Sequence, residues 1–371
     1  MDFLTLARKI AVTTGKSVTR QFYEALLLKY GKHHVGLSEY HEYGIWDPAL
    51  SENQRQQFIG WRTSQALDHQ LNLDFARVLA NDKLINYTIL HARGMPIPQP
   101  VATYSRHGRQ IADEPVLTTE AEVRAFIKDT NYPLFVKPIS AGYGRGAMGI
   151  AGSESARVHL LDGSTIEMDE FLKPFRFAPF QGMLFQQCIE AHPALQVLTG
   201  SKAISCVRMI CLVADAEPVI HTTFLKIVTA NNMLDNFSHG DYGNCLAAID
   251  PATGTITHAI RRMAPDGSIE HHPTTGQRLI GFTLPDWKPA LELVKKATAH
   301  FPGLRLQNWD VALTDKGPLL VELNTESELA VPQAINHRGL MDQRLQDCLR
   351  EIENQDRLLL QASLSVQEQR P

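Results

Sequence analysis

Hydrophobic residues in the first 80 positions recur at intervals of three and four. Phe3, Leu6 and Ile10 share one face of a helix, and the same spacing returns at Phe22 and Leu26. This periodicity is typical of amphipathic helices, so we expect residues 1–80 to form a helical N-terminal region. The region shows no set of catalytic side chains, and a packing or partner role is the default expectation.

Two stretches within this region are less regular. Residues 36–48 are rich in aromatic side chains. They are either a packing strap or part of a substrate mouth, and the strap is the favoured interpretation. Ser51 is a candidate N-cap for one helix that continues through Phe58, Trp61 and Leu67. The first 80 residues therefore predict helical structure, and the candidate functional residues lie in the rest of the chain.

After residue 80 the pattern changes to short apolar runs separated by turns, which is typical of a mixed protein of helices and strands. We expect one helix to begin at Asn81 to Lys83, where Lys83 makes a helix-start contact, and another after Thr119. A strand with an internal turn is expected from Leu161 to Met168. Further strands are expected at residues 133–138, 183–190, 203–213 and 222–228.

A late hairpin carries three oxygen donors. Residues 308–313 alternate polar and apolar side chains, a turn follows, and residues 319–324 form a second apolar run. Asp310 lies on the first strand, whereas Glu322 and Asn324 project from one face of the second. Such oxygens suit Mg²⁺, which takes a few protein ligands together with water and phosphate oxygens. The alternative is a solvated hairpin with ordinary surface acids.

A glycine-rich loop follows the strand at residues 133–138. That strand ends in Lys137-Pro138, and the loop contains Gly142, Gly144, Arg145 and Gly146. Small residues let backbone N–H groups close around phosphate, and the two basic side chains add positive charge. The loop is not a Walker loop, because the Gly-Lys-Ser/Thr ending is missing. A flexible hairpin is the alternative.

Arg208 lies within an apolar run, where a guanidinium is costly to bury without an anionic partner. A terminal phosphate of ATP or a substrate carboxylate would serve. Lys226 repeats this pattern in the next strand. Residues 231–244 form a polar loop that is either solvated or functional, and Asn236 and His239 are its best candidates for function.

Composition excludes several classes of protein. The net charge of −4 gives no reason to expect nucleic acid binding. No run reaches the roughly 18 to 20 apolar residues that span a bilayer. The five dispersed cysteines indicate reduced thiols and a cytoplasmic location, and Cys188 and Cys206 are expected in the core. A homodimer is possible, and the polar end of the chain, about residues 361–371, is expected to fray.

Together these motifs resemble the ATP-grasp superfamily: a strand that ends in Lys-Pro, a glycine-rich loop, and a late Asp…Glu-Leu-Asn set. The closer resemblance is to the group associated with sugar-transfer genes. Over about residues 80–345, its characteristic segments stand here at 192–195 (HPAL), from Ser201 to Arg208, and from Asp235-Asn236 through Gly243 to Asp250–Gly254.

The resemblance implies an α+β fold, in which two mixed lobes hold ATP between their sheets after a helical N-terminal part. These parts together make up the 371 residues of the chain. The expected divisions are 1–80 for the helical region, 81–185 for the first lobe, 186–350 for the second lobe, and 351–371 for the end of the last helix and a polar tail.

The resemblance also implies roles for particular residues. Lys137, Gly142, Gly144, Arg145 and Gly146 would contact the phosphates, and two Mg²⁺ ions would bind Asp310, Glu322 and Asn324. Gln187 and Ile189 would make backbone contacts to adenine, with Gln186 or Glu190 reaching the purine or ribose; a plain buried strand is the alternative. Arg208, Lys226 and Asn236 would act in catalysis. Related proteins usually carry Arg at position 226, so the fork geometry is lost there.

The implied reaction activates a carboxylate as an acylphosphate, which an amine then displaces, with ADP and phosphate as products. Small-molecule acids and amines would be the partners besides ATP. Two other functions remain open: a kinase of the same fold, and a non-catalytic ATP-binding module. The complete Asp310, Glu322 and Asn324 set argues against the module, because a degenerate sensor would more often have lost one ligand.

Overall fold

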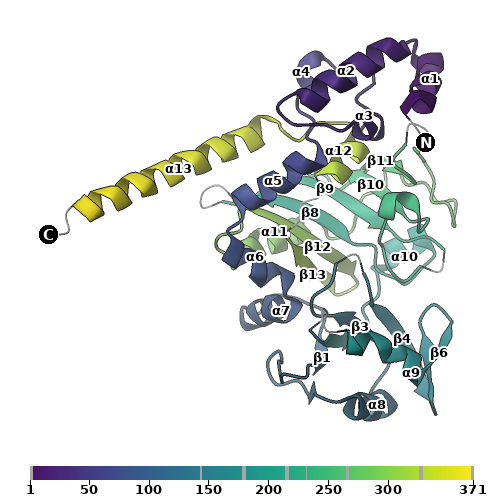
Figure 1. The fold of residues 1–371 in the computed structure, drawn as a ribbon. Coiled ribbons are helices and arrows are strands. Elements are labelled where there is room, and N and C mark those ends of the chain that lie inside the picture. The colour runs from purple at the N-terminus through teal and green to yellow at the C-terminus, as the bar shows by residue number, and fades with distance from the viewer. Residues whose placement is uncertain are drawn as a thin grey trace.

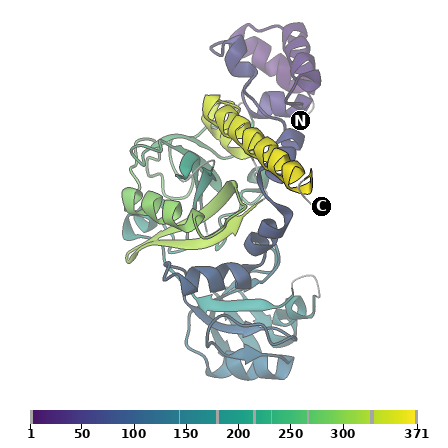
Figure 2. The same cartoon turned by 90° about the vertical axis from the view of Figure 1, so that its left-hand side faces the viewer.

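The computed structural model describes residues 3–142, 144–177, 181–213, 217–230, 232–264, 267–325 and 329–368. The molecule is elongated, with the N-terminal helices at one end, a first β-sheet at the other end, and a second sheet between them (Figures 1 and 2). The C-terminal helix projects from the side of the body (Figure 1). No helix of the described chain is long and apolar enough to cross a membrane.

The N-terminal region is helical, as the periodicity predicts. Its first helices pack around Tyr40, Tyr43 and Phe58, which are buried in one cluster with Val35. The aromatic stretch at residues 36–48 thus packs like a strap, although it contains a short helix that the sequence did not predict. The helices are α1 (Phe3–Thr14), α2 (Val18–Tyr30), α3 (Leu37–Glu42), α4 (Glu52–Arg55), α5 (Trp61–Leu71), α6 (Asp74–Asn81) and α7 (Lys83–Ala92).

The single helix predicted after Ser51 is wrong, because the structure has two helices, α4 and α5, separated by residues 56–60. Ser51 does cap the first of them. The interruption is a tertiary effect: the N–H of Ile59 donates to Gln333 Oε1 at 2.8 Å, and Gln333 Nε2 donates to the Ile59 carbonyl at 2.8 Å. Backbone groups bonded to Gln333 cannot also join a helical ladder.

The first sheet has seven strands in the order β2-β1-β7-β3-β4-β5-β6. Its core includes Ala102, Val136 and Phe185, and α8 packs on it. The strand predicted from Leu161 to Met168 is wrong in detail: Leu161 lies in the turn between β5 and β6, where Asp162 accepts a hydrogen bond from the Ser164 N–H. The elements are β1 (Pro100–Tyr104), β2 (Val116–Leu117), α8 (Glu120–Asp129), β3 (Leu134–Pro138), β4 (Met148–Glu154), β5 (Arg157–Leu160), β6 (Thr165–Glu167), α9 (Met168–Phe171), η1 (Lys173–Arg176) and β7 (Met183–Gln187).

The second sheet has six antiparallel strands in the order β11-β10-β9-β8-β12-β13. One face packs against α11, around Trp287, Val294 and Trp309. Part of the other face lies under α5, α12 and α13, and the rest faces the first sheet. The elements are α10 (Pro193–Thr199), β8 (Val207–Leu212), β9 (Val219–Ile227), η3 (Ser238–Gly240), β10 (Cys245–Ile249), β11 (Ile256–Ile260), α11 (Trp287–Thr298), β12 (Leu306–Thr314), β13 (Gly317–Asn324), α12 (Ala330–Asn336) and α13 (Gln343–Glu368).

These two sheets and the helical N-terminal region confirm the expected α+β class. The expected lobe boundary between residues 185 and 186 falls inside β7, which pairs with β1 and β3 in the first sheet. We therefore propose that the first lobe extends through Gln187. The two sheets meet where Tyr87 of α7 donates a hydrogen bond to the Val321 carbonyl of β13 at 3.0 Å.

The role of Gln333 can be tested by Gln333→Ala. The substitution would leave the Ile59 N–H and carbonyl and the Leu340 N–H without their present partner in the protein interior. Each unpaired buried group costs about 1–3 kcal/mol, so we expect a loss of roughly 3 kcal/mol in the free energy of unfolding, measured by urea denaturation. Gln56→Ala is the matched control, because the Gln56 side chain is exposed and bonds to the exposed Glu52 side chain at 3.5 Å; equal midpoints for the two variants would contradict this account.

Candidate active site

A cavity of about 1670 Å³ lies between the two sheets. It brings together most of the residues that the sequence singled out. Only Gly146 and Gln187 of the predicted set do not line it. The lining includes Lys137, Gly142, Gly144, Arg145, Gln186, Ile189, Glu190, Arg208, Lys226, Asn236, Asp310, Glu322 and Asn324.

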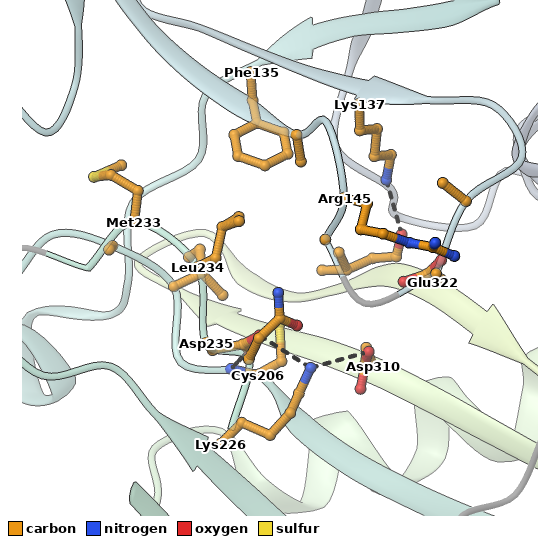
Figure 3. Close-up of a pocket in the computed structure, with 18 of the residues that line it drawn as sticks. Phe135, Lys137, Arg145, Cys206, Lys226, Met233, Leu234, Asp235, Asp310 and Glu322 are labelled. Carbon is orange, nitrogen blue, oxygen red and sulfur yellow. Dashed lines mark hydrogen bonds and ion pairs between the residues drawn. The ribbon is translucent and has the colours of Figure 1, made fainter. Parts of the chain in front are cut away.

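Arg208 and Lys226 both pair with Asp310 on the floor of this cavity. Arg208 donates to the two Asp310 oxygens at 2.5 and 2.9 Å, and Lys226 Nζ lies 3.2 Å from Asp310 and 3.0 Å from Asp235 (Figure 3). The strand register places Arg208 directly opposite Asp310. The anionic partner expected for a buried Arg208 is therefore a carboxylate of the protein itself in this structure.

These ion pairs keep the cluster charged despite its burial. Burial works against ionisation of Asp310, but Arg208 and Lys226 outweigh it and lower the Asp310 pKa to about 2. Burial likewise opposes the charge of Arg208 and Lys226, and the neighbouring carboxylates raise both pKa values. At neutral pH the floor of the cavity thus carries the two cations Arg208 and Lys226 beside the ionised carboxylate of Asp310.

The hairpin of β12 and β13 places its oxygen donors as the alternation predicts. Asp310 lies opposite Glu322, and Asn308 lies opposite Asn324. Buried Asn308 Oδ1 and Asn324 Nδ2 have no hydrogen-bond partner among the described residues. Of these two atoms only Asn308 Oδ1 is an oxygen, the kind of ligand that a hard cation prefers, whereas Asn324 Nδ2 is an N–H donor. Asn308 did not stand out in the sequence, although its alternation with Asp310 places it on the same face.

The candidate metal set consists of two carboxylates and an amide. In the described parts of the chain, no group of three His, Cys, Asp or Glu side chains could hold a metal ion. Both carboxylates also have cationic partners, but each carboxylate offers about four lone-pair positions and can accept more than one partner. The donor chemistry therefore fits Mg²⁺ with water and phosphate oxygens as further ligands.

Lys83 belongs to this cavity, and its interpretation as a simple helix-start contact is wrong. Its Nζ lies 2.9 Å from Glu322 and donates to the Ala141 carbonyl of the glycine-rich loop at 2.7 Å. Lys83 is the first residue of α7, after the N-cap Asp82. A cation is unfavourable next to the positive end of a helix dipole, so its position there was a usable signal that an anion lies nearby.

Lys137 is held rigidly from two sides. Its Nζ donates to the Tyr87 hydroxyl at 2.9 Å and to the Val321 carbonyl at 3.3 Å. Burial lowers the Lys137 pKa to about 8, although Glu322 acts in the opposite direction. Tyr87 lies at an ordinary apolar position of a helix, so nothing in the sequence marked it. These two hydrogen bonds hold the buried Lys137 ammonium group between the first sheet and the second.

The end of β7 contributes the part of the cavity expected to meet adenine. Gln186 is buried with its Oε1 3.5 Å from the Tyr87 hydroxyl, and Ile189 lines the cavity. Glu190 pairs with Lys202 at 3.0 Å. Gln187 is exposed, and its N–H donates to the Gln99 carbonyl. The strand ends at Gln187, three residues earlier than predicted.

The glycine-rich loop touches the polar loop of the second lobe. Gly144 has a φ of +65°, and a Cβ at this position would lie 2.2 Å from Asn236 Nδ2. Asn236 is therefore in direct contact with the phosphate-binding loop predicted from the first lobe. Asn231 lies outside the described residues, and so does the side chain of His239.

Asn244 shapes this polar loop, although no pattern in the sequence singled it out. Its buried side chain donates to the carbonyls of Leu234 and Asn236 at 2.8 Å each, and it accepts from the Thr229 N–H at 3.0 Å. These bonds connect both ends of the loop and fix the segment that carries Asp235 and Asn236.

Some of the motifs are structural. His192 caps α10 by accepting from the Ala194 N–H at 3.1 Å, and Asp250 accepts from Ala252 and Thr253 in the turn before β11. Cys206 lines the cavity, but burial raises its pKa well above the usual value. A protonated Cys206 is consistent with a core thiol and unsuited to nucleophilic attack.

The family described as sugar-transfer associated ATP-grasp matches residues 62–350, which is most of the chain. The protein belongs to this family, and the resemblance drawn from the sequence motifs is confirmed. Comparison with curated proteins found no match.

Solved structures of amino acid ligases are among those similar to this chain. The L-amino acid ligase from Bacillus licheniformis matches with 13% identity, a TM-score of 0.41, and coverage of 78% of this chain and 52% of its own. The VanG D-Ala:D-Ser ligase from Enterococcus faecalis matches with 15% identity, a TM-score of 0.41, and coverage of 75% and 62%. The D-alanine-D-alanine ligase from Coxiella burnetii matches with 13% identity, a TM-score of 0.41, and coverage of 82% and 69%. The match thus spans about half to two thirds of these ligases' own lengths.

The contact between the two loops predicts different effects for two glycines. Gly144→Ala would put a side chain at positive φ and against Asn236, which costs about 1–3 kcal/mol. Since 1 kcal/mol is a factor of about five, we expect trypsin to cut at exposed Arg145 at least fivefold faster than in the wild type. Gly142→Ala is the control, because a Cβ there meets nothing within 4 Å. Equal cleavage of both variants would show that the two loops do not hold each other.

Proposed function

We propose that the protein is an ATP-dependent ligase that activates a carboxylate as an acylphosphate and joins it to an amine. The observation that carries this proposal is the convergence of two buried cations, two half-buried cations and three carboxylates from both lobes on one cavity. They are Lys83, Lys137, Arg208, Lys226, Asp235, Asp310 and Glu322. Membership in an ATP-grasp family supports the nucleotide assignment.

ATP would lie with its base toward β7 and its phosphates toward the hairpin of the second sheet. Phe135 faces Met233 and Leu234 across one end of the cavity (Figure 3), which suits a flat base. Gln186 and Ile189 line the same cavity. At the other end, Lys137 and Arg145 extend from the first lobe toward Glu322 (Figure 3).

Mg²⁺ would be held by Asp310, Glu322 and Asn324. Asn308 lies opposite Asn324 on the neighbouring strand. Bound there, the metal would neutralise charge on the phosphate oxygens. The cationic side chains of the protein would stabilise the same negative charge on the phosphate oxygens. Arg208 and Lys226 are already fixed by Asp310 and Asp235, so little reorganisation is needed when negative charge develops beside them.

The chemical steps need no nucleophile from the protein. A carboxylate oxygen of the substrate attacks the γ-phosphorus, the bond from phosphorus to the bridging oxygen breaks, and ADP leaves with the electron pair. The amine then attacks the acyl carbon, the C–N bond forms, and phosphate leaves as the amine loses a proton. Positioning and electrostatic stabilisation are sufficient for both steps. The protonated state of Cys206 agrees with this route.

We expect Glu322→Gln and Asp310→Asn each to reduce ATP turnover by at least about a hundredfold, the effect of losing one key electrostatic group. Both changes remove a negative charge next to the phosphates. Asp315→Asn is the control, because Asp315 lies exposed in the turn of the same hairpin. ADP release is measured for each variant after thermal melting has confirmed that it is folded. Wild-type turnover in folded Glu322→Gln would remove the metal assignment.

The reaction class predicts its products. With a carboxylate, ATP and Mg²⁺, hydroxylamine should intercept the acylphosphate and give a hydroxamate together with ADP, because hydroxylamine replaces the amine. Phosphate and ADP should form in equal amounts. AMP and pyrophosphate would contradict the mechanism. A stable phosphorylated product that resists hydroxylamine would instead identify a kinase, and ATP binding without any turnover would identify a binding module.

A further inference from the structure

The cavity is larger than one ligand needs. Pockets for single small molecules usually measure about 300–1000 Å³, whereas this cavity measures about 1670 Å³. The base end and the phosphate end described above use only part of its wall. A separate part, on the second lobe, is lined by apolar side chains: Phe224, Phe237, Leu246, Met263 and Val331. We refer to these five residues as the apolar wall.

The apolar wall adjoins the cationic floor through the strand register. Phe224 on β9 lies opposite Arg208 on β8, and Leu246 on β10 lies opposite Lys226 on β9. Side chains that are opposite in a sheet project from the same face. An apolar surface and two cationic groups therefore lie side by side, on the face of the second sheet that looks into the cavity.

This wall is a fixed part of the core. Phe224, Phe237 and Leu246 are at most 8% exposed, and they belong to the cluster beneath α5, α12 and α13. Met263 and Val331 pack against the same cluster while remaining half-buried at the cavity. A ligand group that contacts this wall would meet an apolar surface that has no need to rearrange.

We propose that the apolar wall binds the side chain of the acid substrate, which is a small carboxylic acid with an alkyl or aromatic group. The inference rests on the proposed ligase function. The carboxylate would lie at Arg208 and Lys226, facing the γ-phosphate, and the apolar group would lie against Phe224, Leu246 and Val331. Acids with hydroxyl, amide or second carboxylate groups would leave these polar groups without partners against the wall.

The specificity is tested by hydroxamate formation with hydroxylamine as the amine, so that the natural amine need not be known. Leucine is compared with its near-isostere asparagine, and 3-phenylpropionate with glutarate. We expect kcat/KM to be at least about tenfold higher for the apolar member of each pair, since a single misplaced polar group or missing methylene has effects of that size. A preference for asparagine and glutarate would show that the apolar wall does not bind the side chain of the acid, and it would leave the ligase mechanism in place.

A variant tests the location. Val331→Thr keeps the shape of the side chain but adds a hydroxyl, and we expect it to raise the KM for the apolar acid by about tenfold, well beyond any change in the KM for ATP. Val197→Thr is the matched control, because Val197 is 68% exposed on α10 and outside the cavity lining. Equal effects of the two substitutions would show that the wall does not contact the acid.

A binding measurement separates this inference from the function on which it rests. Calorimetry with a non-hydrolysable ATP analogue bound should show weaker binding of the apolar acid to Val331→Thr than to the wild type. If the apolar acid binds but no acid yields ADP or hydroxamate, the ligase function fails and the subsite stands. If no apolar acid binds or reacts, the subsite is wrong.

Discussion

Compensation among buried charges is the constraint on which the rest of this structure depends. Arg208, Lys226 and Asp310 lie on neighbouring strands in the protein interior, where an unpaired charge would cost several kcal/mol. The strand register places Arg208 opposite Asp310, and Lys226 lies at hydrogen-bond distance from Asp310 and Asp235. Lys83 and Glu322 form another ion pair at the junction of the two lobes. The cluster is therefore held in place before any ligand arrives, which is the condition for effective electrostatic stabilisation.

Two facing sheets are well suited to hold such a cluster. In the strands that line the cavity, side chains that face it alternate with side chains that face a core, so one strand serves both purposes. Val136 is buried in the core of the first sheet, whereas Phe135 and Lys137 on either side of it line the cavity. In the second sheet Met209 packs under α11 while Arg208 faces the cavity. The stability of the cores thus fixes the positions of the polar groups.

The walls of the cavity divide it into regions of different chemistry. Phe135 and its partners offer an apolar cleft at one end, charged side chains occupy the centre, and the apolar wall around Phe224 lies beyond Lys226. A nucleotide has one apolar end and one highly charged end, so it matches the first two regions. The third region has no counterpart in a nucleotide, which is why its chemistry bears on the second ligand.

Local patterns of residues were enough to predict many of the elements and most donors of the site. Alternation in residues 308–324 places Asp310, Glu322 and Asn324 on a hairpin, and the glycines after Lys137 mark a loop that can approach phosphate. Which groups meet across the chain depends on the fold. It paired Lys83 with Glu322, ended the helix at residues 56–60 through Gln333, and brought Asn236 against Gly144. Periodicity depends on neighbours in sequence, whereas these contacts join residues tens to hundreds of positions apart, and no local pattern encodes them.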